Sequence, residues 1–209
     1  MIEKKFVKAK KDEFAIKEFV ANELGKGRIS NIEIERTPVG EKISVTTSKP
    51  GVVIGSRGEK IAELTETLKN TFKLENPYIE IIELQNADLD AKTIADETAL
   101  MLERFGPLKF KIIAYKMLQR IAAAGALGAE IRLSGKLPSE RAKSWRFGFG
   151  YLKKTGDTAK IVSRAQAVAK TIPGIVGVKV AILPPDVKIH DKIEVEKKIT
   201  EEAKEETKK

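Results

Sequence analysis

The spacing of apolar residues in the first third of the chain changes from that of a helix to that of strands. In residues 12–24 they recur at intervals of three and four, which predicts a helix that begins at an aspartate cap. Residues 32–35 and 43–47 alternate apolar with polar side chains, which predicts two strands joined by a turn at residues 37–40. The isoleucine-rich residues 78–84 predict a third strand.

The remaining pattern predicts two helices followed by a sheet. The polar residues 85–90 are typical of a connection between domains, and helices are expected at residues 91–104 and 107–124. Residues 164–170 alternate alanine with larger side chains, which favours a strand over the helix that alanine alone would suggest. Four strands are therefore expected, at residues 130–134, 145–151, 164–170 and 176–183.

The polar loop Gly55-Ser56-Arg57-Gly58 stands between an aliphatic run and an amphipathic helix. Two glycines allow a backbone to approach a sugar-phosphate chain closely, and loop amides at a helix start favour anions. Arg57 and Lys60 add positive charge to this loop. Two more G-x-x-G matches, at residues 125–128 and 174–177, have apolar middles. A glycine turn that only caps a helix is the alternative interpretation.

The order of the elements in residues 12–84 resembles that of a type II KH domain: helix, strand, strand, short helix, G-x-x-G loop, helix, strand. The resemblance implies a three-stranded mixed sheet with helices, whose loop grips single-stranded RNA. We expect an α+β protein with a KH domain at residues 1–86 and a charged tail at residues 191–209. Between them, residues 87–190 should form a second α+β domain, with two helices packed on a mainly antiparallel sheet.

Composition narrows the class of partner. The 209 residues contain 39 lysines and arginines against 30 aspartates and glutamates, and this net charge of +9 favours a polyanionic partner. The absence of cysteine excludes disulfides and thiolate metal sites. No apolar run approaches the roughly 20 residues that span a bilayer, so we expect a cytoplasmic protein with no membrane partner. We expect no cofactor and no metal.

Two segments concentrate positive charge. The predicted helix at residues 107–124 has four cations and no acid, and residues 136–154 have six cations against the single acid Glu140. A solvated basic surface is the alternative to a nucleic-acid site. The cations are Lys109, Lys111, Lys116 and Arg120 in the helix, then Lys136, Arg141, Lys143, Arg146, Lys153 and Lys154.

Aromatic residues alternate with the second group of cations. Aromatic rings beside basic residues suit nucleic acid, because the rings stack on unpaired bases. These rings share one parity, however, so they would line one face of a strand, which favours packing in a core. The cations on the loops and on the opposite face are therefore the better RNA-binding candidates. The four aromatic residues are Trp145, Phe147, Phe149 and Tyr151.

Four motifs stand in a specific order along the chain: VIGSRG at residues 53–58, GAEIRLSGKL at 128–137, KSWR at 143–146 and GIVGVKV at 174–180. Together they resemble the small ribosomal subunit protein S-three family in its archaeal and eukaryotic form. The resemblance covers about residues 3–190.

This resemblance implies a structural protein of the small-subunit head, in contact with small-subunit ribosomal RNA and with neighbouring proteins. One flank would face the channel where messenger RNA enters, and family members help to hold and unwind messenger RNA there without hydrolysing nucleotide. Lys111 and Lys116 match two cations that bacterial relatives use for this purpose. Ile112 and Tyr115 stand where the bacterial pattern has two more cations, which leaves the unwinding role open.

We assign the RNA contacts to three groups of residues. In the helix at residues 107–124, Lys111, Lys116 and Arg120 are expected to lie along entering messenger RNA, and Lys109 is a further RNA-binding candidate. Residues 55–58, with Lys60, are expected to clamp a few nucleotides of either RNA. The third group is expected to anchor ribosomal RNA through its phosphates and consists of Arg132, Lys136, Arg141, Lys143, Arg146, Lys153 and Lys154.

An enzyme is a competing class. Residues 128–137 contain a G-x-x-x-x-x-x-G-K run that is too long for a phosphate-binding loop, and Leu137 replaces the Ser or Thr that binds magnesium. His190 is the only histidine, which excludes histidine dyads. Eukaryotic relatives have a reported DNA-lesion nicking activity, which could use a lysine amine as nucleophile, but no lysine here has a sequence context that would depress its pKa. We therefore expect no catalytic residue. A free-standing KH regulator of RNA is a third possibility, but it leaves the second domain without a role.

Overall fold

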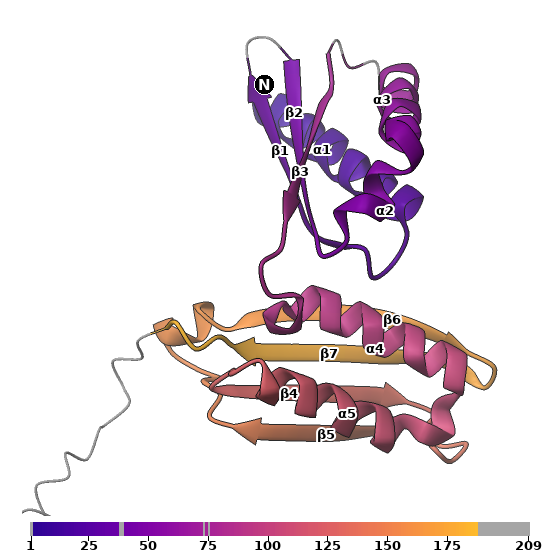
Figure 1. Ribbon diagram of the computed structural model, residues 1–209, viewed down its shortest axis with the longest axis vertical. Coiled ribbons are helices and arrows are strands. Elements are labelled where there is room, and N and C mark those ends of the chain that lie inside the picture. The colour runs from indigo at the N-terminus through magenta and orange to yellow at the C-terminus, as the bar shows by residue number, and fades with distance from the viewer. Residues whose placement is uncertain (1, 38–39, 73, 75, 188–209) are drawn as a thin grey trace, which may run out of the picture.

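The computed structural model describes residues 2–37, 40–72, 74 and 76–187, which form two halves with separate hydrophobic cores (Figure 1). The first core includes Ile43 and Leu68, and the second includes Met117 and Ile131, all of them fully buried. The predicted tail at residues 191–209 and His190 lie outside the described residues, as do two residues of the turn expected at 37–40.

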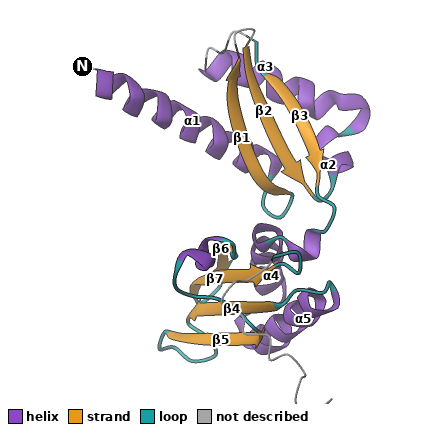
Figure 2. Ribbon diagram, turned by 90° about the vertical axis from the view of Figure 1, so that its left-hand side faces the viewer, coloured by secondary structure: helices purple, strands orange, loops and turns teal. Residues whose placement is uncertain are grey.

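The N-terminal half is a three-stranded sheet covered by helices (Figure 2). Its elements are α1 (Ile2–Leu24), β1 (Ile29–Thr37), β2 (Gly40–Thr47), α2 (Pro50–Ile54), η1 (Ser56–Gly58), α3 (Glu59–Phe72) and β3 (Tyr78–Glu83). Strand β2 is central, antiparallel to β1 and parallel to β3. The mixed sheet and the element order expected for a type II KH domain are therefore confirmed.

Helix α1 begins about three turns earlier than predicted, at Ile2 instead of Asp12. Only the second half of α1 packs on the core, where Ile16 and Val20 are buried. The first half buries no apolar residue, and the apolar spacing therefore did not predict it. Lysine, alanine and glutamate all favour helix, and Glu13 receives Lys10 at 2.6 Å one turn away. Asp12 is therefore an interior helical residue, and the prediction of a cap there was wrong.

The C-terminal half places two helices on one face of a four-stranded antiparallel sheet (Figures 1 and 2). Its strands lie in the order β5-β4-β7-β6, which confirms the expected sheet, and residues 164–170 are a strand as predicted. The elements are η2 (Ala87–Leu89), α4 (Ala91–Phe105), η3 (Pro107–Lys109), α5 (Phe110–Ala123), β4 (Gly128–Gly135), β5 (Lys143–Gly150), η4 (Asp157–Lys160), β6 (Ser163–Thr171) and β7 (Gly174–Leu183).

The aromatic residues of β5 pack between the sheet and α5. The Phe110 ring centroid lies 5.4 Å from that of Trp145 and 6.2 Å from that of Phe147, and Phe149 is partly buried against the same core. Core packing, favoured from their shared parity, is confirmed for these three strand residues. Tyr151 lies beyond the end of β5 and is exposed, so it does not continue the row.

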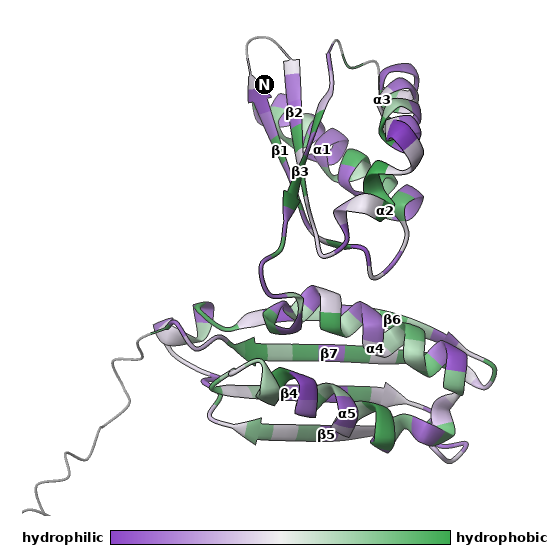
Figure 3. Cartoon of the chain, in the orientation of Figure 1, coloured by the Kyte–Doolittle hydropathy of each residue, from purple (hydrophilic) through white to green (hydrophobic). Residues whose placement is uncertain are grey.

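Hydropathy follows this layered arrangement. Apolar residues are concentrated along β7, which lies between two other strands, while polar residues colour much of α3 (Figure 3). Every second residue of β7 from Val176 to Ile182 is buried beneath α4 and α5. Among the described residues, no helix combines the length and the apolar character needed to cross a bilayer.

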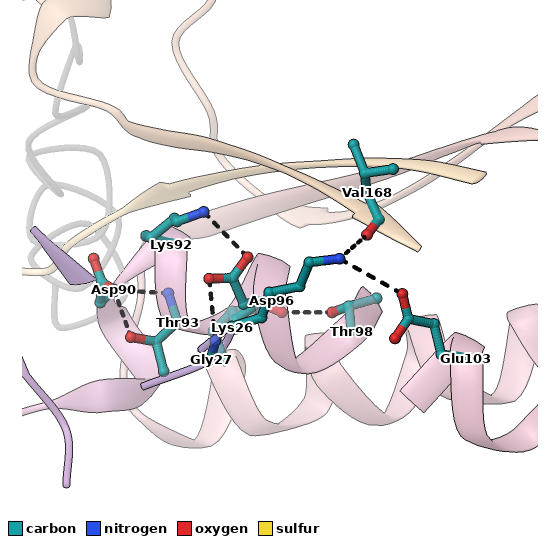
Figure 4. A network of polar contacts seen from close by, with 10 residues as sticks. Lys26, Gly27, Asp90, Lys92, Thr93, Asp96, Thr98, Glu103 and Val168 are labelled. Atoms are coloured by element: carbon teal, nitrogen blue, oxygen red, sulfur yellow. Dashed lines mark hydrogen bonds and ion pairs between the residues drawn. The ribbon is translucent and has the colours of Figure 1, made fainter. Parts of the chain in front are cut away.

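Polar contacts join the two halves at the loop between α1 and β1 (Figure 4). The Gly27 amide donates a hydrogen bond to Asp96 Oδ2 on α4, at 3.3 Å. The Lys26 amine donates to the Val168 carbonyl oxygen on β6 at 3.2 Å and lies 3.7 Å from Glu103 Oε1. The N-terminal half therefore rests on α4 and on the β6 edge of the second sheet.

The substitution Asp96→Ala should lower the free energy of unfolding by about 1–3 kcal/mol. Only 7% of the Asp96 side chain is exposed, and its loss leaves the Gly27 amide and the Lys92 amine without their acceptor. Urea denaturation followed by circular dichroism measures the effect. Asp96→Asn, which keeps an acceptor for Gly27, should lose less. Equal midpoints for wild type and Asp96→Ala would contradict a role for this contact.

Candidate nucleic-acid interface

The G-x-x-G loop lies between α2 and α3 and has an unusual backbone. Gly55 and Gly58 have φ angles of 74° and 83°, in the region that glycine adopts most easily. Arg57 has a φ of 53°, and it is the only residue other than glycine with positive φ in the described part of the chain. Such a conformation costs of order 1–3 kcal/mol and is found mainly at functional sites. The loop therefore presents the exposed Arg57 side chain at an energetic cost.

Gly55 is required for a second reason, because the Lys60 side chain lies directly against it. A Cβ atom added at Gly55 would stand 2.8 Å from Lys60 Cγ, which is closer than van der Waals contact permits. Lys60 belongs to the first turn of α3 and is exposed. The loop therefore carries the cation Arg57 and is followed by the cation Lys60, and the space beside Gly58 is open.

The cations at the start of α5 lie beside aromatic rings. Lys111 Nζ stands 5.0 Å from the Trp145 ring centroid, and Lys109 Nζ stands 5.9 Å from that of Phe105. A ring face attracts a cation and holds its long side chain in place. Lys116 is exposed one turn later on the same helix. The structure thus places three of the four predicted cations of this segment at the surface, with Lys109 beside α4 and Lys111 beside β5.

Arg120 differs from these three because it is bound within the fold. Its guanidinium pairs with Asp88 of η2 and donates to Glu97 Oε2 of α4 at 2.7 Å. Partial burial disfavours its charge, but the hydrogen bonds and charges of Glu97 and Asp88 outweigh this and raise the pKa of Arg120. Its contact with messenger RNA stays a prediction, whereas its structural contact joins α5 to the connection between the halves.

Glu130 collects three of the cations assigned to ribosomal RNA. It lies on β4, and its carboxylate receives Lys154 at 2.7 Å, Arg146 at 3.2 Å and Arg132 at 3.4 Å. Burial raises the pKa of Glu130, since its side chain is only 12% exposed, but the Lys154 hydrogen bond and the three positive charges lower it further than burial raises it. The sequence suggested Glu140 as the acid of this segment, but Glu130 is the acid that these cations meet.

The other predicted cations lie on or near loops. Lys136 and Arg141 belong to the connection between β4 and β5, and Lys143 is the first residue of β5. All three side chains are exposed, and none forms an ion pair with a described residue. Lys153 follows the end of β5 and is half-buried.

Sequence reasoning missed two sets of surface cations. Arg164 of β6 and Lys179 of β7 are exposed on the face of the sheet that the helices leave open. They were missed because strand register is needed to place them beside Arg132. The other set lies on the first half of α1, beside the exposed Phe6 and Phe14, and consists of Lys4, Lys5, Lys8, Lys10 and Lys11.

Comparison with known proteins assigns the chain to a family. Residues 15–89 match the KH domain family, and residues 102–182 match the family described as the C-terminal domain of ribosomal protein S3. These matches and the fold define a two-domain ribosomal protein that carries an RNA-binding KH domain. In particular, the chain belongs to the small ribosomal subunit protein uS3 family.

Several archaeal proteins carry that name and align over most of this chain. The Methanocaldococcus jannaschii protein is 43% identical, and the alignment covers 92% of each chain. The Methanococcus vannielii protein is 39% identical over 92% of this chain and 91% of its own. The Methanosphaera stadtmanae protein is 38% identical over 93% of this chain and 77% of its own. The expected resemblance to this family is confirmed.

The substitution Arg57→Gly should separate the strain of the loop from its charge. Glycine adopts positive φ without steric cost, so the free energy of unfolding should stay the same or rise by up to about 1 kcal/mol. Loss of the cation should weaken the binding of a single-stranded RNA in a fluorescence anisotropy titration. Arg57→Lys keeps the charge and is the control. Unchanged affinity for Arg57→Gly would show that the loop cation does not contact RNA.

The ion pairs of Glu130 should make stability depend on pH. Because the folded pKa of Glu130 is lowered, its contribution is complete above the unfolded-state pKa of about 4.3 and is lost as the pH falls through the folded value. Glu130→Gln should therefore reduce the free energy of unfolding by about 1–2 kcal/mol at pH 7. The difference from wild type should shrink as the pH falls below about 4. Urea denaturation followed by Trp145 fluorescence tests this, and a constant difference would contradict it.

Proposed function

We propose that this protein is a structural component of the small ribosomal subunit and binds ribosomal RNA with its C-terminal half. Membership of the uS3 family supports the structural role in the small subunit. The single observation that carries the RNA contact is the gathering of exposed cations around β4 and β5. Arg132, Lys143 and Arg146 lie on these strands, with Lys136 and Arg141 between them. Side chains of this kind contact phosphates and read the shape of a folded RNA.

Messenger RNA is the second RNA in this proposal, and it lies along the start of α5 where it enters the subunit. Lys109, Lys111 and Lys116 are at the surface there, which supports such a contact. The exposed Ile112 and Tyr115 lie among them, 68% and 63% exposed. Helix α5 therefore offers fewer charges to an RNA strand than a fully basic face would. It supports the holding of messenger RNA better than its unwinding.

The KH loop supplies a third contact, to a few nucleotides of either RNA. Its positive φ angles and the exposed cations Arg57 and Lys60 support the clamp. Neighbouring ribosomal proteins complete the set of partners, and the exposed Phe6 and Phe14 on the projecting half of α1 are suited to such a contact. We place the boundary between the two domains after residue 86, just before η2.

The proposal is tested by a sucrose gradient of lysate from the source cells, at moderate and high salt, probed with an antibody to this chain. We expect stoichiometric migration with small subunits at both salts, because an integral component is held by many contacts at once. A ribosomal protein of another family serves as the internal standard. Migration only near the top of the gradient at both salts would contradict the structural role and favour a free-standing KH regulator.

A further inference from the structure

The strand register of the C-terminal sheet places cations in one continuous row. Arg146 of β5 pairs with Arg132 of β4, Arg132 pairs with Lys179 of β7, and Lys179 pairs with Gln166 of β6. Neighbouring strands are about 4.8 Å apart, so these four side chains cross the whole sheet side by side. All four are exposed and alternate along their strands with residues that are buried or partly buried in the core beneath α4 and α5. We call this set the cross-strand row.

Such a row is unfavourable for the protein alone. Like charges at directly paired positions destabilise a sheet. Glu130 is the only acidic residue on β4, β5, β6 and β7, and its ion pairs are with Arg132, Arg146 and Lys154. Among the described residues, Lys179 and Arg164 have no ion-pair partner. The face therefore carries an uncompensated positive charge that the fold does not use.

A hollow in this face brings cations from several elements together. It has a volume of about 340 Å³ and is lined by Glu130, Arg132, Lys154, Arg164 and Lys179, among others. Four of these five side chains are cations from three different strands and the loop after β5. The charge of these converging side chains matches that of a polyanion. The group of cations also covers a larger area than a single small anion would fill.

The aromatic residues decide which part of a nucleic acid fits. A four-stranded sheet that reads single-stranded RNA stacks bases on aromatic side chains of its open face. Here the rings of Trp145 and Phe147 pack against the helices, and no strand residue on the open face is aromatic. The face offers charge without stacking, so it suits the sugar-phosphate backbone of a folded RNA and carries no base preference.

We propose that the cross-strand row, with Lys154 and Arg164, is a binding site for the phosphate backbone of small-subunit ribosomal RNA. The site adds Lys179, Arg164 and Gln166 to the contacts assigned above and rests on the proposed ribosomal function. Glu130 acts as an internal counter-ion that holds Arg132, Arg146 and Lys154 in place in the free protein. When RNA binds, its phosphates replace Glu130 as the partners of these cations. The proposed site lies apart from the G-x-x-G loop, which belongs to the N-terminal half.

The test is the salt dependence of RNA binding by the full chain. The variant Arg132→Gln/Lys179→Gln is compared with Arg36→Gln/Lys69→Gln, which removes the same charge from exposed positions on β1 and α3. The probes are a transcript of small-subunit ribosomal RNA and an unrelated RNA hairpin duplex. The slope of log K against log salt is negative, and the loss of two phosphate contacts should make it shallower by roughly 1.4–1.8 for both probes. The control pair should leave both slopes close to wild type.

Thermal unfolding separates a binding role from a structural one. If the row is kept for RNA, Lys179→Gln should melt at the same temperature as wild type or higher, because Lys179 has no ion-pair partner among the described residues and its repulsion from Arg132 is relieved. Glu130→Gln should bind both probes more tightly, since three cations lose their internal partner. If the double variant fails to fold, Lys179→Gln alone should make the slope of log K against log salt shallower by roughly 0.7–0.9.

Failure of this inference is distinguishable from failure of the proposed function. If wild type binds ribosomal RNA and the double variant keeps the full salt slope, the proposed site is wrong and the ribosomal role stands. A double variant that melts lower and keeps its slope would likewise assign the row to the fold. Wild type that binds the hairpin through the row but does not bind ribosomal RNA would support the phosphate chemistry and contradict the ribosomal role.

Discussion

The two-residue repeat of the C-terminal strands is the constraint on which both the core and the proposed RNA surface depend. In β5 the rings of Trp145 and Phe147 pack against Phe110, while Arg146 between them reaches Glu130 on the open face. A slip of one residue in the pairing of β5 would bury Arg146 and expose both rings. The burial of the rings therefore fixes the register, and the register in turn aligns Arg146 with Arg132. Apolar packing on one face thus decides where the charges stand on the other.

Carboxylates divide the many cations into structural and available ones. A chain with a net charge of +9 repels itself, and each buried or half-buried cation needs a partner. Arg120 receives two carboxylates and joins α5 to η2 and α4. Glu130 serves three cations at once, and so it satisfies none of them completely. The same residue types therefore have different roles, and their roles follow from how many acids face each one.

Local patterns in the sequence were sufficient for most of the fold. The KH element order and the strand at residues 164–170 were predicted because apolar alternation and turn residues are local signals. The first ten residues of α1 were missed because they bury nothing and their helix depends on propensity and on pairs such as Lys10 with Glu13. The partners of Arg120 were missed for another reason. Asp88 is 32 residues away along the chain, and only the packing of α5 on η2 brings the two together.

Polar contacts join the two halves, whereas apolar side chains fill each core, and this difference decides how the proposed RNA surfaces would act together. Gly27, Lys26, Asp96 and Glu103 meet through hydrogen bonds and an ion pair instead of a continuous apolar cluster. Polar groups that separate can bind water again, so such a joint resists a change of angle less than a core does. The cross-strand row belongs to the C-terminal sheet and the G-x-x-G loop to the N-terminal half. An RNA that contacts both would therefore set the angle between them, and the second contact would form at a high effective concentration.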